Sequence, residues 1–170
     1  MPPRAIKGAA FSKDTVAFLR LLAKHRVRYL IVGGEAVIFH GYPRVTGDID
    51  FFYEDSLSNS RRLFAALHEF WDGRIPGLKS VADLREPGVI TQFGRPPHRI
   101  DLMNRIDGIS FATAWSSRIR VRFEADSEPI AVFYLSRRAL LKNKRAAGRP
   151  KDLDDVRFLA AVTSRKPPRS

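Results

Sequence analysis

The sequence contains no cysteine. This absence excludes disulfides, thiol nucleophiles and every zinc site built on thiolates, so any bound metal must be held by oxygen or imidazole ligands. Long apolar runs are also missing, since none approaches the roughly 20 residues that a transmembrane helix requires. The N-terminal segment lacks the apolar stretch of a secretory signal. We therefore expect a cytoplasmic protein without a membrane span.

The length and composition fit one compact domain. A chain of 170 residues can bury a core without help from disulfides or a structural metal. Its hydrophobic fraction of 44% and its charged fraction of 28% are near the averages for globular proteins. We expect a single domain over residues 1–170, with its core at about 12–163 and with basic, flexible termini.

The charge balance is strongly basic. The chain has 30 Lys and Arg residues against 18 Asp and Glu, which gives a formal net charge of +12. Such a surface attracts polyanions and favours a nucleic acid partner. Several of these charges lie in the Pro- and Arg-rich ends of the chain, at Arg4 and at residues 165–169. A merely basic surface without a nucleic acid partner therefore remains an alternative.

The pattern of apolar residues predicts both strands and helices. An apolar run over residues 28–32 predicts a strand that ends at Gly33 and Gly34, after which Ala36 and Val37 return to helical spacing. Further strands are predicted over residues 48–53, 89–93, 99–103, 118–123 and 130–134. Further helices are predicted to begin after Ser12, behind Asn59 or Ser60, at Ile109, after Ser136 and near Asp152. These elements predict an α/β domain.

Asp48 and Asp50 form a D-x-D motif on a predicted strand. Successive side chains of a strand alternate between its faces, so both carboxylates project to one side, with Cα atoms about 6.6 Å apart. Two carboxylates this close repel each other unless a cation or a proton lies between them. An oxygen-only site favours Mg²⁺ or Mn²⁺. The alternative is a pair of solvated carboxylates at a strand end.

Two further features support a site beside the D-x-D motif. Gly33 and Gly34 stand at a strand-to-helix turn, where the absence of side chains lets phosphate oxygens approach backbone N–H groups. The alternative is a tight turn that needs positive φ. Asp101 lies in a later strand among apolar neighbours, where a carboxylate is costly to bury unless it is paired. Its alternative is an ordinary salt bridge with Arg95 or Arg99.

The segment GGEAVIFHGYPRVTGDIDFF, residues 33–52, resembles the nucleotidyltransferases of the DNA polymerase β-like superfamily, in which a Gly-Gly or Gly-Ser turn precedes D-x-D. Together with the strand RIDLM and the segment KRAAGRPKDLDDV, it is similar to abortive-infection and toxin–antitoxin nucleotidyltransferases, from about Tyr29 to Leu159. The resemblance implies the nucleotidyltransferase fold, an α/β fold in which helices flank a mixed central sheet and C-terminal helices complete the site.

The resemblance also implies roles for particular residues. Asp48 and Asp50 would be the metal ligands, and Asp101 would be the third carboxylate, which shares a metal and draws the proton from the acceptor hydroxyl. Gly33 and Gly34 would hold triphosphate oxygens. Residues near the C-terminus would neutralise the triphosphate and complete the site, namely Lys144, Lys142, Arg149, Lys151 and Asp152.

Other positions carry weaker signals. Arg44 and Thr46 precede the D-x-D motif and either reach phosphate or brace the loop, whereas His40 fits a packed helix histidine better than a ligand. Many superfamily members carry Ser at the second turn position. Gly34 removes that hydroxyl contact to phosphate, and backbone donors must replace it.

The predicted function is metal-dependent transfer of a nucleotide from a nucleoside triphosphate to an acceptor hydroxyl, with release of pyrophosphate. The charge and the resemblance favour RNA as the acceptor, in particular the tRNA 3′ end, and a role as the toxin of a toxin–antitoxin system with a cognate antitoxin as a further partner. A protein or small-molecule acceptor is one alternative. A non-catalytic nucleotide- or RNA-binding module of the same fold is another.

Overall fold

The computed structural model describes residues 5–7, 11–126 and 128–164, with side chains over 11–126 and 128–161. The predicted basic termini, including residues 165–169, therefore lie largely outside the described residues. None of the helices within the described ranges combines the length and the apolar composition that crossing a bilayer requires.

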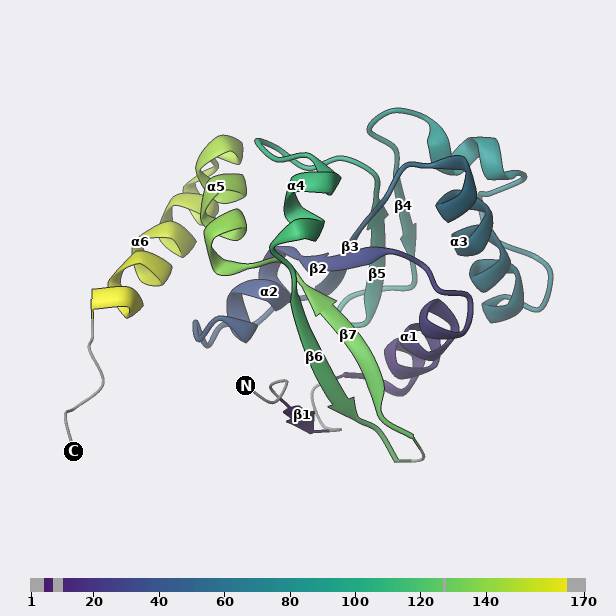
Figure 1. The fold of residues 1–170 in the computed structure, drawn as a ribbon, viewed down its shortest axis with the longest axis horizontal. Coiled ribbons are helices and arrows are strands. Elements are labelled where there is room, and N and C mark those ends of the chain that lie inside the picture. Colours follow the sequence, from purple (N-terminus) through teal and green to yellow (C-terminus); the bar gives the residue numbers. More distant parts are fainter. Residues whose placement is uncertain (1–4, 8–10, 127, 165–170) are drawn as a thin grey trace.

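A seven-stranded mixed sheet forms the centre of the molecule, with the strand order β1-β6-β7-β2-β3-β5-β4 (Figure 1). In chain order, the strands are β1 (Ala5–Lys7), β2 (Tyr29–Val32), β3 (Asp48–Tyr53), β4 (Ile90–Phe93), β5 (Arg99–Met103), β6 (Ile119–Glu124) and β7 (Ile130–Tyr134). Strand β3 pairs antiparallel with β2 and parallel with β5. The two strands that carry the predicted carboxylates are therefore direct neighbours.

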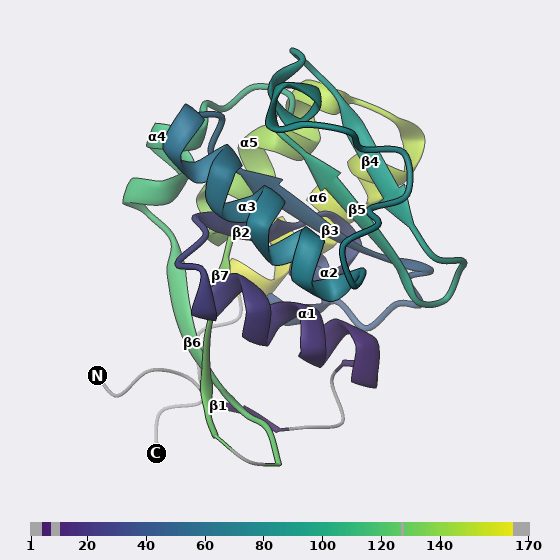
Figure 2. The ribbon, with the colours of Figure 1, turned by 90° about the vertical axis from the view of Figure 1, so that its right-hand side faces the viewer.

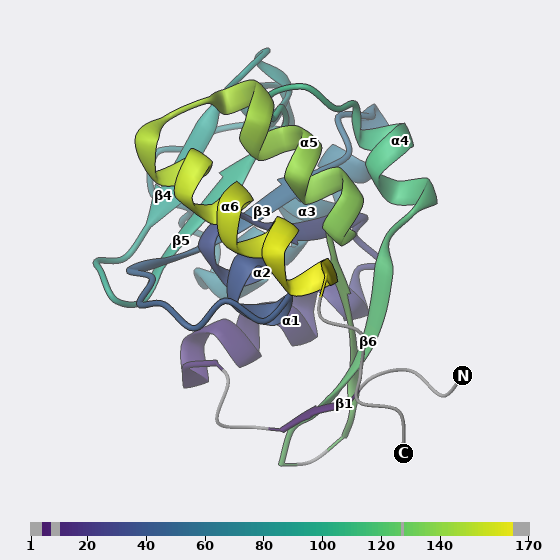
Figure 3. The same ribbon diagram turned by 90° about the vertical axis from the view of Figure 1, so that its left-hand side faces the viewer.

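Helices cover both faces of this sheet. They are α1 (Lys13–Lys24), α2 (Gly33–Phe39), α3 (Leu57–Phe70), α4 (Phe111–Ser116), α5 (Arg137–Ala147) and α6 (Pro150–Ser164), with a short 3₁₀ helix, η2 (Val81–Arg85). Helices α1 and α3 lie in front of the sheet in Figure 2, whereas α5 and α6 lie in front of it in Figure 3, which shows the opposite side. The protein therefore has an α/β fold in which a mixed sheet lies between two layers of helices.

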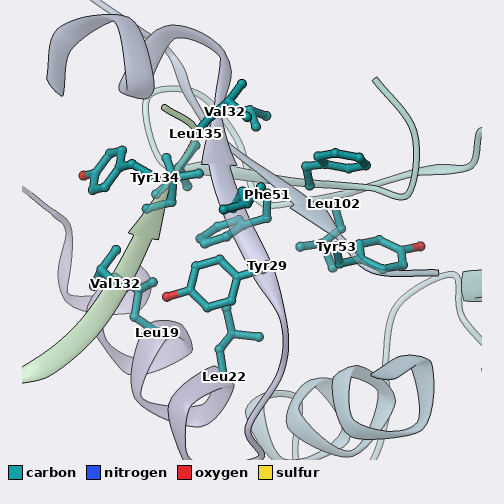
Figure 4. Close-up of a cluster of buried hydrophobic side chains, with 14 of the residues drawn as sticks. Leu19, Leu22, Tyr29, Val32, Phe51, Tyr53, Leu102, Val132, Tyr134 and Leu135 are labelled. Carbon is teal, nitrogen blue, oxygen red and sulfur yellow. The ribbon is translucent and has the colours of Figure 1, made fainter. Parts of the chain in front are cut away.

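The packing of the core determines to which face of the sheet the D-x-D motif points. The two carboxylates lie on the face opposite to α1. Along β3, Ile49 and Phe51 are buried, while Asp48 and Asp50, which alternate with them, are partly exposed. The Phe51 ring packs edge-to-face against Phe18 of α1, with 5.4 Å between ring centroids, and it contacts Tyr29 at the same distance. Figure 4 shows Tyr29 and Phe51 within this apolar cluster. Burial of the apolar residues fixes the strand and turns both carboxylates to the other face.

Two helix starts differ from the prediction, since α4 begins at Phe111 and not at Ile109, and the start of α3 was also misplaced. Helix α3 begins at Leu57, and its N-cap is Ser56, whose Oγ accepts a hydrogen bond from the Asn59 N–H at 3.2 Å. Asn59 and Ser60 are buried inside the helix instead of capping it. The Asn59 amide is used elsewhere, because it donates to the backbone carbonyls of Arg28 and Glu54 and ties the ends of β2 and β3 together. Strand β1 and the 3₁₀ helix η2 were not predicted from the sequence.

Candidate active site

The pairing of β3 with β5 brings the three predicted carboxylates together. In this parallel register, Asp50 lies opposite Asp101, and Asp48 lies opposite Arg99. All four side chains line a cleft of about 900 Å³ on the sheet face that α5 and α6 cover. Residues some 50 positions apart in the sequence thus share one polar cluster, which we call the carboxylate cluster (Asp48, Asp50, Asp101 and Arg99).

Arg99 connects two of these carboxylates directly. Its Nη2 donates to Asp48 Oδ2 at 2.6 Å and to Asp101 Oδ2 at 3.0 Å, while its Nε donates to Asp101 Oδ1 at 2.8 Å. Gln92 of the edge strand β4 adds a hydrogen bond to Asp101 Oδ2 at 3.2 Å. The carboxylates, Asp101 foremost, raise the pKa of Arg99. The alternative reading of Asp101 as an Arg99 partner is therefore seen in the structure, and it includes Asp48 as well.

Asp50 lies against Gly33. The described contacts include no hydrogen bond between Asp50 and a cationic side chain. A Cβ atom added to Gly33 would meet Asp50 Oδ2 at 2.0 Å, and the Gly33 φ of +63° is itself unfavourable for other residues. Burial, followed by the charges of Asp101 and Asp48, raises the pKa of Asp50 to about 7. Glycine at position 33 therefore makes room for a carboxylate that strongly favours a nearby proton or cation.

The donor set suits a hard divalent cation. The three carboxylates offer only oxygen, which is what Mg²⁺ and Mn²⁺ prefer. Asp48 Oδ1 is buried and has no hydrogen-bond partner, so one oxygen of the cluster is free for a further ligand. Within the described residues, no three acidic or histidine side chains already converge as a formed metal site. The guanidinium of Arg99 lies between Asp48 and Asp101 and donates hydrogen bonds to both.

A second ionic group, the buried ion network, forms one wall of the cleft. Lys144 of α5 is only 5% exposed, and its Nζ lies 2.9 Å from Asp152 Oδ1 and 3.1 Å from Asp155 Oδ2, both on α6. Arg149 Nε donates to Asp152 Oδ2 at 2.7 Å. Arg44 Nη2 lies 3.3 Å from Asp155 Oδ2. The network consists of these five residues, and it fixes a lysine beside the carboxylate cluster, where its charge opposes the rise in the pKa of Asp50.

The loop before β3 is braced against both the glycine turn and the D-x-D motif. Thr46 Oγ1 accepts a hydrogen bond from the Asp48 N–H and donates one to the Asp48 carbonyl, each at 3.2 Å. A Cβ atom on Gly34 would approach Thr46 Oγ1 to 2.7 Å and Arg44 Nη2 to 3.0 Å. Of the two roles considered for Thr46 and Arg44, bracing of the loop is therefore visible in the structure.

Most of the predicted site residues line this single cleft. They are Gly33, Gly34, Arg44, Thr46, Asp48, Asp50, Asp101, Lys144, Arg149, Lys151 and Asp152. Lys142 does not line it and is exposed. Residues two apart on a helix point to nearly opposite sides, so α5 cannot present both Lys142 and Lys144 to the cleft. His40 contacts the Leu135 carbonyl through Nε2 at 2.8 Å, as expected of a packed histidine.

Sequence reasoning missed several residues of the site. No role in the site was predicted for Asp155, although this residue lies three positions after Asp152 and hence on the same side of α6. Gln92 and Arg105 also line the cleft, and neither carried a local signal that sets it apart from other exposed polar residues. The helical spacing from Asp152 was sufficient to predict Asp155. Gln92 and Arg105 could be found only from the three-dimensional structure.

Comparison with known proteins agrees with this geometry. The chain matches the family described as nucleotidyltransferase of unknown function (DUF6036) over residues 13–164, which include every element of the cleft. No curated protein matches the chain. Since the match covers nearly all of the sequence, the chain belongs to this nucleotidyltransferase family.

Proposed function

We propose that the chain is a metal-dependent nucleotidyltransferase that moves a nucleotide from a nucleoside triphosphate to an acceptor hydroxyl and releases pyrophosphate. One observation carries the proposal. Asp48 and Asp50 on β3 and Asp101 on β5 face one cleft, directly beside the Gly33-Gly34 turn. We further propose that this sheet and its helices are a nucleotidyltransferase fold, which the family assignment supports.

Each part of the cleft has a role in this proposal. A divalent cation, when bound, stabilises the attacking and leaving oxygens of an in-line displacement. Asp48 and Asp50 would hold it, and Asp101 would share it and accept the proton of the acceptor hydroxyl. The backbone at Gly33 and Gly34 would lie against the triphosphate oxygens, because no side chain blocks their approach.

The basic wall would neutralise the triphosphate. Lys144 is fixed by Asp152 and Asp155, so it can present a positive charge without a large loss of side-chain entropy on binding. Arg149 and Lys151 are exposed at the start of α6 and line the same cleft. Positioning and charge neutralisation are the main tasks of a protein that transfers a phosphoryl-type group.

For the acceptor, we propose RNA, in particular the tRNA 3′ end, and a role as the toxin of a toxin–antitoxin system. The net charge of +12 supports a polyanionic acceptor, because basic surfaces bind nucleic acids through counterion release. Arg105 at the cleft and the exposed arginines of β6 add to this charge on the described surface. Growth that is unaffected when the protein is induced would argue against the toxin role.

The test is a labelling reaction. Purified protein is incubated with total tRNA, Mg²⁺ and each labelled nucleoside triphosphate, and label on RNA and on protein is read from one gel. The Asp48→Ala variant tests the site, and Asp126→Ala is its matched control, because Asp126 is an exposed acid outside the cleft. We expect tRNA label that is lost in Asp48→Ala and kept in Asp126→Ala. Label on protein would shift the acceptor, and no label would favour a non-catalytic binding module.

A further inference from the structure

Arg99 holds the carboxylate cluster in the way that a shared cation would. One nitrogen, Nη2, contacts an oxygen of Asp48 at 2.6 Å and an oxygen of Asp101 at 3.0 Å. Across the described contacts, it is the cationic side chain with hydrogen bonds to acids of the cluster on both β3 and β5. Asp48 and Asp101, which would hold a divalent metal together with Asp50, are thus the residues that Arg99 already contacts.

We propose that Arg99 is an internal counter-cation, and that a divalent metal ion enters the site only by displacing its guanidinium from Asp48 and Asp101. This inference rests on the proposed metal-dependent function. Arg99 donates to both oxygens of Asp101, so a metal that Asp101 shares competes with the guanidinium even though Asp48 Oδ1 is free, and two cations this close repel each other. Arginine cannot lose its proton in a protein, so the side chain must move when the metal binds.

The structure leaves room for that movement. The Arg99 side chain is 28% exposed and lines the cleft, so it can turn into solvent-filled space without disturbing the buried core. Its backbone stays paired with β3 through the Asp48 register. Gln92 retains its own hydrogen bond to Asp101, which limits how far that carboxylate swings when Arg99 departs.

This exchange couples metal binding to nucleotide binding. Without nucleotide, metal binding breaks the Arg99 contacts, and the released guanidinium gains no multiply charged anion as a new partner. A triphosphate in the cleft supplies that anion, so its presence strengthens metal binding, and metal strengthens triphosphate binding by the same factor. Arg99 thus keeps the metal site closed until the donor substrate arrives.

The experiment measures binding of Mn²⁺ alone to the full chain, from the free Mn²⁺ signal in electron paramagnetic resonance. Three proteins are compared, namely wild type, Arg99→Gln and Arg95→Gln. The control removes the same charge from an exposed arginine four positions away, for which the described contacts include no ion pair. We expect Arg99→Gln to bind Mn²⁺ about tenfold more tightly than wild type. Arg95→Gln should stay within about twofold of wild type.

The outcomes separate this inference from the function on which it rests. Equal Mn²⁺ affinity in wild type and Arg99→Gln overturns the displacement of Arg99 and leaves the metal site standing. No Mn²⁺ binding by any of the three proteins overturns both. A second measurement, made on the wild-type protein, does not need a stable Arg99→Gln protein. The Arg99 Nε–Hε signal in nuclear magnetic resonance, assigned with Arg99→Lys, must shift when Mg²⁺ saturates the protein, and an unchanged signal overturns the proposal.

Discussion

Two groups of charges lie side by side in the cleft, and they are built in opposite ways. The carboxylate cluster has three acids and one arginine, is partly exposed, and leaves Asp48 Oδ1 unpaired. The buried ion network sets two acids, Asp152 and Asp155, against three basic side chains, and both acids are 1% exposed. In the carboxylate cluster the acids outnumber the single cation, whereas in the buried ion network each fully buried acid has at least two basic partners that hold its geometry. The cleft thus combines one exchangeable part with one fixed part.

The largest expected effect tests the fixed part. Lys144→Met removes the buried charge between Asp152 and Asp155, and we expect it to lower the free energy of unfolding by about 3 kcal/mol, because breaking a buried ion network leaves acids without their central partner. This loss is at the lower end of the range for broken buried ion pairs, because Arg149 and Arg44 still neutralise Asp152 and Asp155. Urea denaturation measures it. Lys142→Met on the exposed side of the same helix is the control and should change stability by less than about 0.5 kcal/mol.

The glycine turn gives the next largest effect. Gly33→Ala combines a positive φ with a clash against Asp50, and we expect a loss of about 2–3 kcal/mol in the free energy of unfolding. Gly77→Ala isolates the backbone contribution, because Gly77 has a φ of +75° and open space where a Cβ would lie. That control should cost only about 1 kcal/mol. Equal losses in the two variants would show that Asp50 moves away from Gly33 without penalty.

A pH series tests the exchangeable part. The pKa of Asp50 is raised to about 7 in the folded protein, above its unfolded value of 3.8, so the protonated form is favoured by folding. This stability is fully present below about pH 4 and is lost as the pH rises through about 7. Asp50→Asn should therefore match wild type near pH 4 in the absence of metal. Near pH 8 it should be more stable by on the order of 2 kcal/mol in thermal or urea unfolding. A variant with no advantage at the higher pH would contradict this environment for Asp50.

The smallest effect separates the buried and exposed partners of Asp152. The Arg149 side chain is 75% exposed, and solvent screens its contact with the acid. Arg149→Ala should lower the free energy of unfolding by less than about 1 kcal/mol, because Lys144 still neutralises Asp152. Urea denaturation beside Lys144→Met makes the comparison. A loss as large as that of Lys144→Met would show that the network depends on its exposed member.

The secondary structure was largely predictable, because its signals are local. Strands β3, β5 and β7 have the predicted bounds, since each is an apolar, β-branched or aromatic run between polar residues. Helix α5 begins after Ser136 as predicted, and it ends at Gly148, where φ is +65°. Asn59 and Ser60 misled the prediction of α3, since polar residues in a first turn resemble caps whether or not they serve as caps.

The candidate site was predictable only in part. The alternation of a strand places Asp48 and Asp50 on one face, and the structure agrees. Nothing in the sequence states the register between β3 and β5, so the contact of Arg99 with Asp48 could not be derived from either segment alone. Helical geometry already separates positions two apart, which explains why Lys142 lies outside the cleft that Lys144 lines.

The position of α6 at the end of the chain affects the order in which the cleft can form during synthesis. During synthesis the N-terminal segments emerge first, so β2, β3 and β5 can pair before the final helix exists. The carboxylates that pair with Lys144 belong to residues 152 and 155, which are synthesised after it. Arg44 lies in the first third of the chain, and it can pair with Asp155 only after that residue has also been synthesised. An incomplete chain therefore holds the carboxylates without their fixed basic wall. The cleft is therefore complete only when the last helix has formed, and a nascent or C-terminally truncated chain lacks one of its two ionic groups.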